Sequence, residues 1–103
     1  MDANQKGSGM ARAIWGGKVL AESTDTVVVE GNHYFPAESI KQELLRASNA
    51  TYTCPWKGTC DYYDVMVNGM VNAQAAWSYP DPKPAAAEIK GRYAFWKGVR
   101  VEA

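Results

Sequence analysis

The sequence has no excess charge of either sign, no long apolar run and few cysteines. Eleven Lys and Arg residues balance eleven Asp and Glu residues. Because nucleic acids and anionic membrane surfaces are bound through a field of positive charge, neither partner is expected. The apolar runs span only a few residues, far short of the ~20 needed to cross a bilayer, so no membrane segment is predicted.

The two cysteines, Cys54 and Cys60, are too few for a disulfide-stabilised secreted fold. Residues 1–10 are polar and rich in glycine, unlike a secretory signal. We therefore expect a cytoplasmic protein with both cysteines as thiols. With His33, the single histidine, they offer three metal ligands at spacings that match no zinc-binding pair. Neither a structural metal nor a cofactor is predicted.

A length of 103 residues suits one domain with its own hydrophobic core. Residues 1–10 contain almost no apolar side chains after the first and are predicted to form a disordered tail. Residues 11–103 are predicted to form a single β-rich domain, because short runs of β-type residues alternate there with turn signals.

Glycine-containing turns divide these runs. Gly16-Gly17 and Asn68-Gly69 each predict a hairpin. The valine-rich segment 26–30 is expected to be the central strand of the sheet, covered on both faces. Two closing strands are predicted at residues 92–96 and 99–102.

One helix of two to three turns is predicted between Pro36 and Ala47. Proline suits a first helical position, and Ile40 and Leu44 recur four residues apart. A further one or two helical turns are expected at residues 85–90. The fold class is therefore mainly β, a β-rich α+β arrangement in which a compact antiparallel sheet carries one short helix.

Four phrases occur in a fixed order: Val27-Val28-Val29-Glu30-Gly31-Asn32-His33-Tyr34-Phe35-Pro36, Cys54-Pro55-Trp56-Lys57-Gly58, Tyr62-Tyr63-Asp64-Val65 and Trp77-x-Tyr79-Pro80-x-Pro82-x-x-Ala85. In these the chain resembles a small, mostly bacterial family, the domain of unknown function 427, sometimes given a nucleotidyltransferase-style name. The likeness covers about residues 11–102. It implies a compact β-sheet or barrel-like single domain and supplies no activity.

The candidates for catalysis are His33, Cys54 and Asp64. A histidine titrates near pH ~6.5 and can act as a general acid or base. Cys54 could be a nucleophile if Lys57 or His33 lowered its pKa. Each has a structural alternative, such as a histidine that braces a turn or a cysteine buried in a strand. Whether the protein is an enzyme stays open.

Aromatic side chains with polar tips are concentrated between Asn32 and Gly91 and predict a ligand pocket. The expected ligand-binding residues are His33, Tyr34, Trp56, Lys57, Tyr62, Trp77 and Tyr79. We expect His33, Trp56 and Asp64 to converge on one cleft.

Binding of a small molecule in this cleft is the predicted function. One alternative is a protein-interaction module that uses the same rings as an exposed Trp/Tyr patch. Another is that the rings only pack the core. The residues indicate neither the identity of a ligand nor the oligomeric state.

Overall fold

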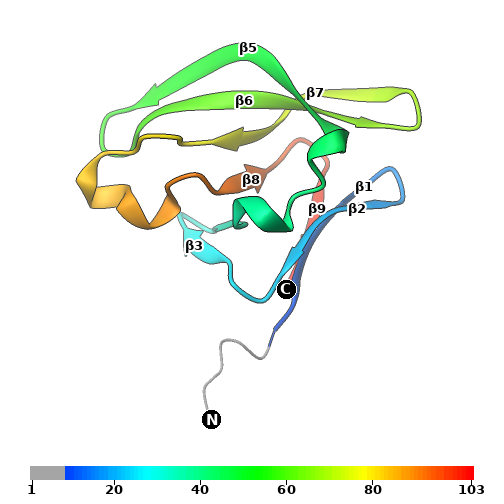
Figure 1. Cartoon of the computed structure of the whole chain (residues 1–103), viewed down its shortest axis with the longest axis horizontal. Coiled ribbons are helices and arrows are strands. Elements are labelled where there is room, and N and C mark those ends of the chain that lie inside the picture. Colours follow the sequence, from blue (N-terminus) through cyan, green and yellow to red (C-terminus); the bar gives the residue numbers. More distant parts are fainter. Residues whose placement is uncertain (1–8) are drawn as a thin grey trace.

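A computed structural model of the chain describes residues 9–103, and most of them lie in strands (Figure 1). The strands are β1 (Ala11–Trp15), β2 (Lys18–Ser23), β3 (Val27–Val29), β4 (Asn32–Tyr34), β5 (Leu45–Cys54), β6 (Gly58–Val67), β7 (Met70–Ser78), β8 (Tyr93–Phe95) and β9 (Arg100–Glu102). The prediction of a mainly β fold is confirmed. Most of the predicted tail, residues 1–8, lies outside the described residues, and Gly9 and Met10 have no regular secondary structure.

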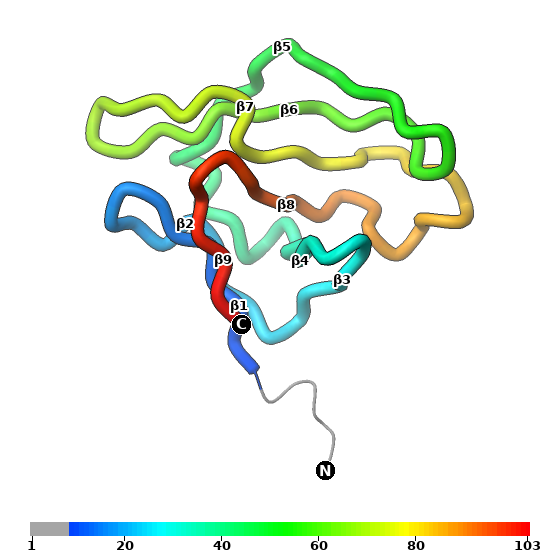
Figure 2. The backbone as a smooth tube through the Cα atoms, turned by 180° about the vertical axis from the view of Figure 1, so that it is seen from behind, coloured from blue at the N-terminus to red at the C-terminus, as the bar shows by residue number. Residues whose placement is uncertain are grey.

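The strands form three antiparallel sheets, in the orders β5-β6-β7-β8, β2-β1-β9 and β3-β4. The β3–β4 hairpin continues the largest sheet, because Phe35, just after β4, exchanges two backbone hydrogen bonds with Tyr93 of β8 at 2.7 and 2.9 Å. Figure 2 shows β8 between the long strands β6 and β7 and the β3–β4 hairpin. The chain therefore forms one compact β domain.

Two-residue turns with positive φ at both positions join several strands, as type I′ turns require. The predicted hairpins at Gly16-Gly17 and Asn68-Gly69 are confirmed. A third turn of this kind, Glu30-Gly31 with φ of 54° and 81°, joins β3 to β4. The sequence did not predict this turn, because Glu30 follows the valine run and was assigned to its strand.

The prediction that residues 26–30 form the central strand is wrong. Among residues 9–103, strand β3 pairs with β4 alone, and Val28 is 55% exposed. The interior strands of the large sheet are instead β6, which pairs with β5 and β7, and β7, which pairs with β6 and β8. A run of valines reports β propensity, which an edge strand and a buried strand share.

The predicted helix between Pro36 and Ala47 is also wrong. This segment contains two short 3-10 helices, η2 (Ala37–Ser39) and η3 (Gln42–Leu44), before β5 begins at Leu45. Between them Ile40 is extended and bridges to Ala21 of β2, while Lys41 donates a backbone hydrogen bond to Leu20 at 2.9 Å. Pairing with β2 therefore overrides the helical spacing of the apolar residues.

The helical turns predicted at residues 85–90 are confirmed by the 3-10 helix η4 (Pro84–Ile89). None of the helices within residues 9–103 is long and apolar enough to cross a membrane.

Buried side chains form two clusters. The first, here called the apolar core, lies beneath β1, β2 and the β6–β7 hairpin and consists of Ala11, Ala13, Leu20, Ala21, Phe35, Ile40, Val65, Val67, Ala75, Ala76 and Phe95. The second, here called the polar-aromatic cluster, consists of Tyr34, Cys54, Cys60, Tyr79, Ala86, Ile89 and Ala94. The second cluster underlies the candidate site.

Candidate functional site

A pocket of about 210 Å³ opens beside the polar-aromatic cluster and is here called the aromatic pocket. Five of its eight lining residues are aromatic; the set is Asn32, Tyr52, Lys57, Cys60, Tyr62, Trp77, Tyr79 and Trp96. The register of the large sheet explains much of this wall. Tyr52 of β5 pairs with Cys60 of β6, and Tyr62 pairs with Trp77 of β7. Paired residues and residues two apart on a strand share one face.

The rings of the pocket wall contact one another. Trp96 lies parallel to Tyr62, with centroids 6.1 Å apart, and meets Trp77 edge-on at 5.5 Å. The Trp77 indole N–H donates to the Tyr34 hydroxyl at 3.1 Å, and the Trp96 indole N–H donates to the Gln74 carbonyl at 2.6 Å. The polar tips are thus used within the protein, which fixes the orientation of the rings.

Asp64 braces this wall from outside the pocket. Strand β7 is bulged opposite Asp64, and Gln74 in the bulge has a φ of 56°. The Asp64 carboxylate accepts the Gln74 backbone N–H at 2.9 Å and an Arg46 N–H at 3.1 Å. The bond from Gln74 and the weaker effect of Arg46 lower the pKa of Asp64 despite its burial. Because the Gln74 carbonyl also accepts the Trp96 indole N–H, Asp64 helps to position the Trp96 ring in the pocket wall.

Lys57 brings a buried positive charge to the pocket. The residue is 7% exposed, and its ammonium lies 5.5 Å from the Trp56 ring centre and 5.6 Å from the Tyr79 ring centre. Its Nζ donates a hydrogen bond to the Glu30 carboxylate at the tip of the β3–β4 hairpin. The Trp56 indole N–H donates to the same carboxylate at 3.3 Å. Glu30 therefore connects the hairpin tip to Lys57, a residue of the pocket lining.

Both charges are stabilised in this pair. Burial disfavours the charge of Lys57, but the hydrogen bond to Glu30 and the nearby Tyr34 and Glu30 oxygens together raise the pKa of Lys57. The hydrogen bond from Lys57, followed by that from Trp56, lowers the pKa of Glu30. At neutral pH the pair is therefore an ammonium and a carboxylate.

Gly58 fixes the backbone position of Lys57. Its φ of +107° lies outside the range of ordinary side-chain-bearing residues, and a Cβ there would lie 3.4 Å from the backbone nitrogen of Lys83. That nitrogen donates to the Lys57 carbonyl at 2.9 Å. Because Gly58 has no side chain, the loop at residues 81–83 can pack against the β5–β6 turn. This contact holds the backbone of Lys57 in place beside the pocket.

The hydroxyl and thiol groups at the base of the pocket are held in their neutral forms. Burial raises the pKa of Cys60, and it also raises the pKa of Tyr34 and of Tyr79. Since a thiolate is the reactive form of cysteine, Cys60 is a poor nucleophile here. Cys54, the candidate nucleophile of the sequence, is 8% exposed within the same cluster, and both cysteines are free thiols.

His33 does not face the aromatic pocket. It follows Asn32 and precedes Tyr34 on β4, so its side chain points to the opposite face of that strand. Its Nδ1 shares a hydrogen bond of 2.9 Å with the Thr26 hydroxyl, and it lines a separate hollow of about 260 Å³. The predicted convergence of His33, Trp56 and Asp64 on one cleft is therefore wrong, since none of the three lines the aromatic pocket.

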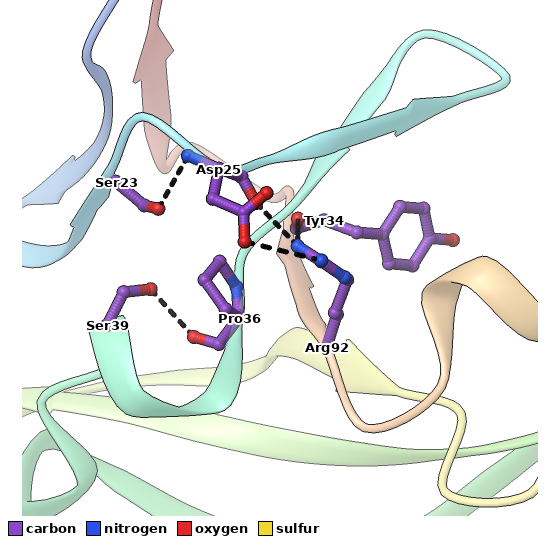
Figure 3. A network of polar contacts seen from close by, with 6 residues as sticks. All are labelled: Ser23, Asp25, Tyr34, Pro36, Ser39 and Arg92. Atoms are coloured by element: carbon purple, nitrogen blue, oxygen red, sulfur yellow. Dashed lines mark hydrogen bonds and ion pairs between the residues drawn. The ribbon is translucent and has the colours of Figure 1, made fainter. Parts of the chain in front are cut away.

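A polar clamp holds the base of the β3–β4 hairpin (Figure 3). The Arg92 guanidinium donates to the Asp25 carbonyl at 2.6 Å and to the Tyr34 carbonyl at 3.4 Å, and it lies 3.7 Å from the Asp25 carboxylate. Figure 3 shows the Tyr34 ring pointing away from Arg92. The clamp fixes the backbone that carries Tyr34 and leaves the hairpin tip, with Glu30, at the far end.

Of the predicted ligand-binding residues, Lys57, Tyr62, Trp77 and Tyr79 line the aromatic pocket. Tyr34 lies beneath it and is bonded to Trp77, whereas Trp56 stands beside it and is bonded to Glu30.

Four further lining residues were not predicted from the sequence: Asn32, Tyr52, Cys60 and Trp96. Pairing the strands on either side of the 55–57 turn would have placed Tyr52 opposite Cys60. No sequence signal marked Trp96, because its place depends on the bulge at Gln74.

Comparisons with known proteins identify the family of the chain and add no activity. No group of three or more His, Cys, Asp or Glu side chains within residues 9–103 is arranged to hold a metal ion. A search of curated proteins found no match. A family model, NTP_transf_9, described as a domain of unknown function, matches residues 4–103. The chain therefore belongs to the DUF427 family.

Proposed function

We propose that this domain binds a small molecule with a planar ring system in the aromatic pocket. The observation that carries the proposal is a wall of five aromatic residues around a concave space of about 210 Å³. Pockets for drug-sized ligands measure roughly 300–1,000 Å³. The smaller volume here suits one ring or two fused rings, held by contact with Trp77, Trp96 and Tyr62.

The proposal is for binding rather than catalysis. Burial keeps the Cys60 thiol and the Tyr79 hydroxyl protonated, and Asp64 is engaged with the β7 bulge. His33, the natural general base, lies on the other face of β4. A cytoplasmic setting is part of the proposal, because Cys54 and Cys60 are free thiols in the described chain.

The alternative is a protein-interaction surface, which the exposure of three rings favours. Tyr52 is 53% exposed, Trp56 40% and Trp96 43%. Aromatic anchors of this kind are frequent at protein interfaces. Tyr62 and Trp77, however, line the concave pocket and are only partly exposed. A ligand that enters the pocket can contact them, and a flat partner surface would not reach them.

A fragment screen followed by nitrogen-15 NMR tests the proposal. Indole, quinoline, adenine and their simple derivatives would be titrated at millimolar concentration while the four tryptophan indole N–H resonances are recorded. We expect shifts at Trp77 and Trp96, with Trp15 of β1 unchanged as the internal control. The proposal fails if no planar fragment shifts Trp77 or Trp96. An indole shift confined to the exposed Trp56 would favour the interaction surface.

A further inference from the structure

The Lys57 ammonium has more hydrogen-bonding capacity than the fold uses. An ammonium carries three N–H donors. Among residues 9–103, its one hydrogen-bond acceptor is Glu30, and the faces of Trp56 and Tyr79 lie on two other sides. Since the Lys57 side chain is 9% exposed, water has little access to the remaining donors. A buried ammonium needs an anionic partner, so whatever occupies the Glu30 position must be negatively charged.

Glu30 is the solvent-exposed member of its pair with Lys57. Its side chain is 51% exposed, and it belongs to a hairpin whose clamp, Arg92, lies at the opposite end. Its φ of 54° falls where Asn, Asp or Gly is preferred in a type I′ turn. Other residues adopt this conformation only with backbone strain. A residue that breaks a local preference without a packing gain indicates a functional requirement, here a carboxylate that reaches Lys57.

We infer that the ligand of the aromatic pocket is an anion, a planar ring that bears a carboxylate or phosphate group, and that this group displaces Glu30 from Lys57. The inference rests on the function proposed above and adds the charge of the ligand. The rings of Trp77 and Trp96 would contact the planar part, while Lys57 and the Asn32 amide, both in the pocket lining, would bind the anionic oxygens. The exchange leaves Lys57 paired throughout, because one anion replaces another as Glu30 moves into solvent.

Trp56 reports on the exchange without contacting the pocket. Its indole N–H is bonded to Glu30, whereas the Trp77 and Trp96 indoles are bonded to Tyr34 and Gln74. Departure of Glu30 should therefore change the Trp56 resonance toward that of a solvated indole. A ligand that enters the pocket and leaves Glu30 in place should change the Trp77 and Trp96 resonances alone.

The test compares indole-3-carboxylate with its neutral isostere indole-3-carboxamide, and phenyl phosphate with phenol, by NMR titration of the full chain. We expect each anion to bind about tenfold more tightly than its neutral counterpart, the effect of one charge-assisted hydrogen bond. Only the anions should shift the Trp56 indole resonance.

Two variants sharpen the test. Glu30→Gln removes the competing charge and should raise the affinity for indole-3-carboxylate about tenfold, leaving that for the carboxamide unchanged. Lys57→Met should abolish the preference for the anion; if it fails to fold, the Glu30→Gln result still decides. The matched control is Glu22→Gln, which breaks the exposed pair of Glu22 with Arg12 on another sheet. It should alter neither affinity.

The outcomes separate the two proposals. Equal binding of acid and amide with shifts at Trp77 and Trp96 would overturn the anionic ligand but leave the aromatic pocket as a binding site. Unchanged acid affinity in Glu30→Gln would likewise overturn the displacement of Glu30. If none of these probes and no planar fragment binds, both proposals fail together.

Discussion

The apolar core and the polar-aromatic cluster use different side chains, although they lie side by side in one small domain. The apolar core is built from Ala, Leu, Ile, Val and Phe, none of which carries a polar side-chain atom. The polar-aromatic cluster contains two tyrosines and two cysteines and borders the aromatic pocket. Burying polar tips requires partners that apolar packing does not. The difference suggests that the first cluster stabilises the fold and the second shapes a binding site.

Adjacent residues show the contrast most clearly. Tyr34 and Phe35 are both fully buried, and they point to opposite faces of the chain, Tyr34 toward the polar-aromatic cluster and Phe35 into the apolar core. Phe35 meets the edge of Phe95, whereas Tyr34 accepts a hydrogen bond from Trp77 of the pocket wall. One peptide unit thus separates a residue of the core from a residue that supports the site.

The largest effect is expected in the apolar core. Phe35→Ala should lower the free energy of unfolding by about 3–5 kcal/mol, because it removes a fully buried ring and leaves a cavity. Urea denaturation followed by far-ultraviolet circular dichroism measures this. A loss below about 1.5 kcal/mol would show that the apolar core does not dominate stability.

A smaller effect is expected at the brace of the pocket wall. Asp64→Ala should cost about 1–2 kcal/mol, since the Gln74 N–H loses its acceptor. It should also shift the Trp96 indole resonance. Asp64→Asn keeps an oxygen acceptor and is the matched control, with a smaller loss. An unchanged Trp96 resonance in Asp64→Ala would refute the role of Asp64 in positioning that ring.

The pH dependence of the same brace follows from the lowered pKa of Asp64. In the unfolded chain the carboxyl binds its proton at a higher pH than in the folded protein, so its contribution to stability is present above about pH 4 and is lost as the pH falls further. Denaturation curves between pH 5 and 2 should show a steeper loss for the wild type than for Asp64→Asn. Equal losses of stability in the wild type and in Asp64→Asn would contradict this prediction.

The smallest effect is expected at alkaline pH. Burial, aided by neighbouring Tyr93, raises the pKa of Tyr63 to about 12. The unfolded chain releases this proton near pH 10, so the wild type should lose stability between about pH 10 and 12. Tyr63→Phe has no such proton to release. The amount by which its free energy of unfolding falls below that of the wild type should therefore narrow between pH 8 and pH 11. A difference in free energy of unfolding that stays constant over this pH range would contradict the raised pKa of Tyr63.

The parts of the fold that short-range rules control were predictable from the sequence. Gly16-Gly17 and Asn68-Gly69 adopt the positive φ values that their hairpins need. The strand at 26–30 and the helix at 36–47 were predicted wrongly, because both depend on which partner is available. Ile40 pairs with β2 instead of turning into a helix, and the valines of β3 find a partner on one side.

The candidate site was predictable in its chemistry and less so in its geometry. The sequence indicated a pocket of aromatic rings with Lys57, Tyr62, Trp77 and Tyr79, and these four residues do line one. It did not indicate that His33 faces the other side of β4, since a shift of one residue in a strand reverses the face. The position of Trp96 depends on the β7 bulge and its long-range bond to Asp64, which local sequence patterns do not encode.

The most direct test of a binding site distinct from the core compares Trp96→Ala with Trp56→Ala, two tryptophans of similar exposure at 43% and 40%. Trp96 lines the aromatic pocket and Trp56 does not. The measurement is the dissociation constant, by NMR titration, of the neutral fragment that binds the wild type most tightly. We predict at least a tenfold loss of affinity in Trp96→Ala, little change in Trp56→Ala, and in both a loss of stability well below the ~3–5 kcal/mol of a core deletion. Equal affinities in the two variants, or a Trp96→Ala protein that is chiefly unfolded, would contradict the account.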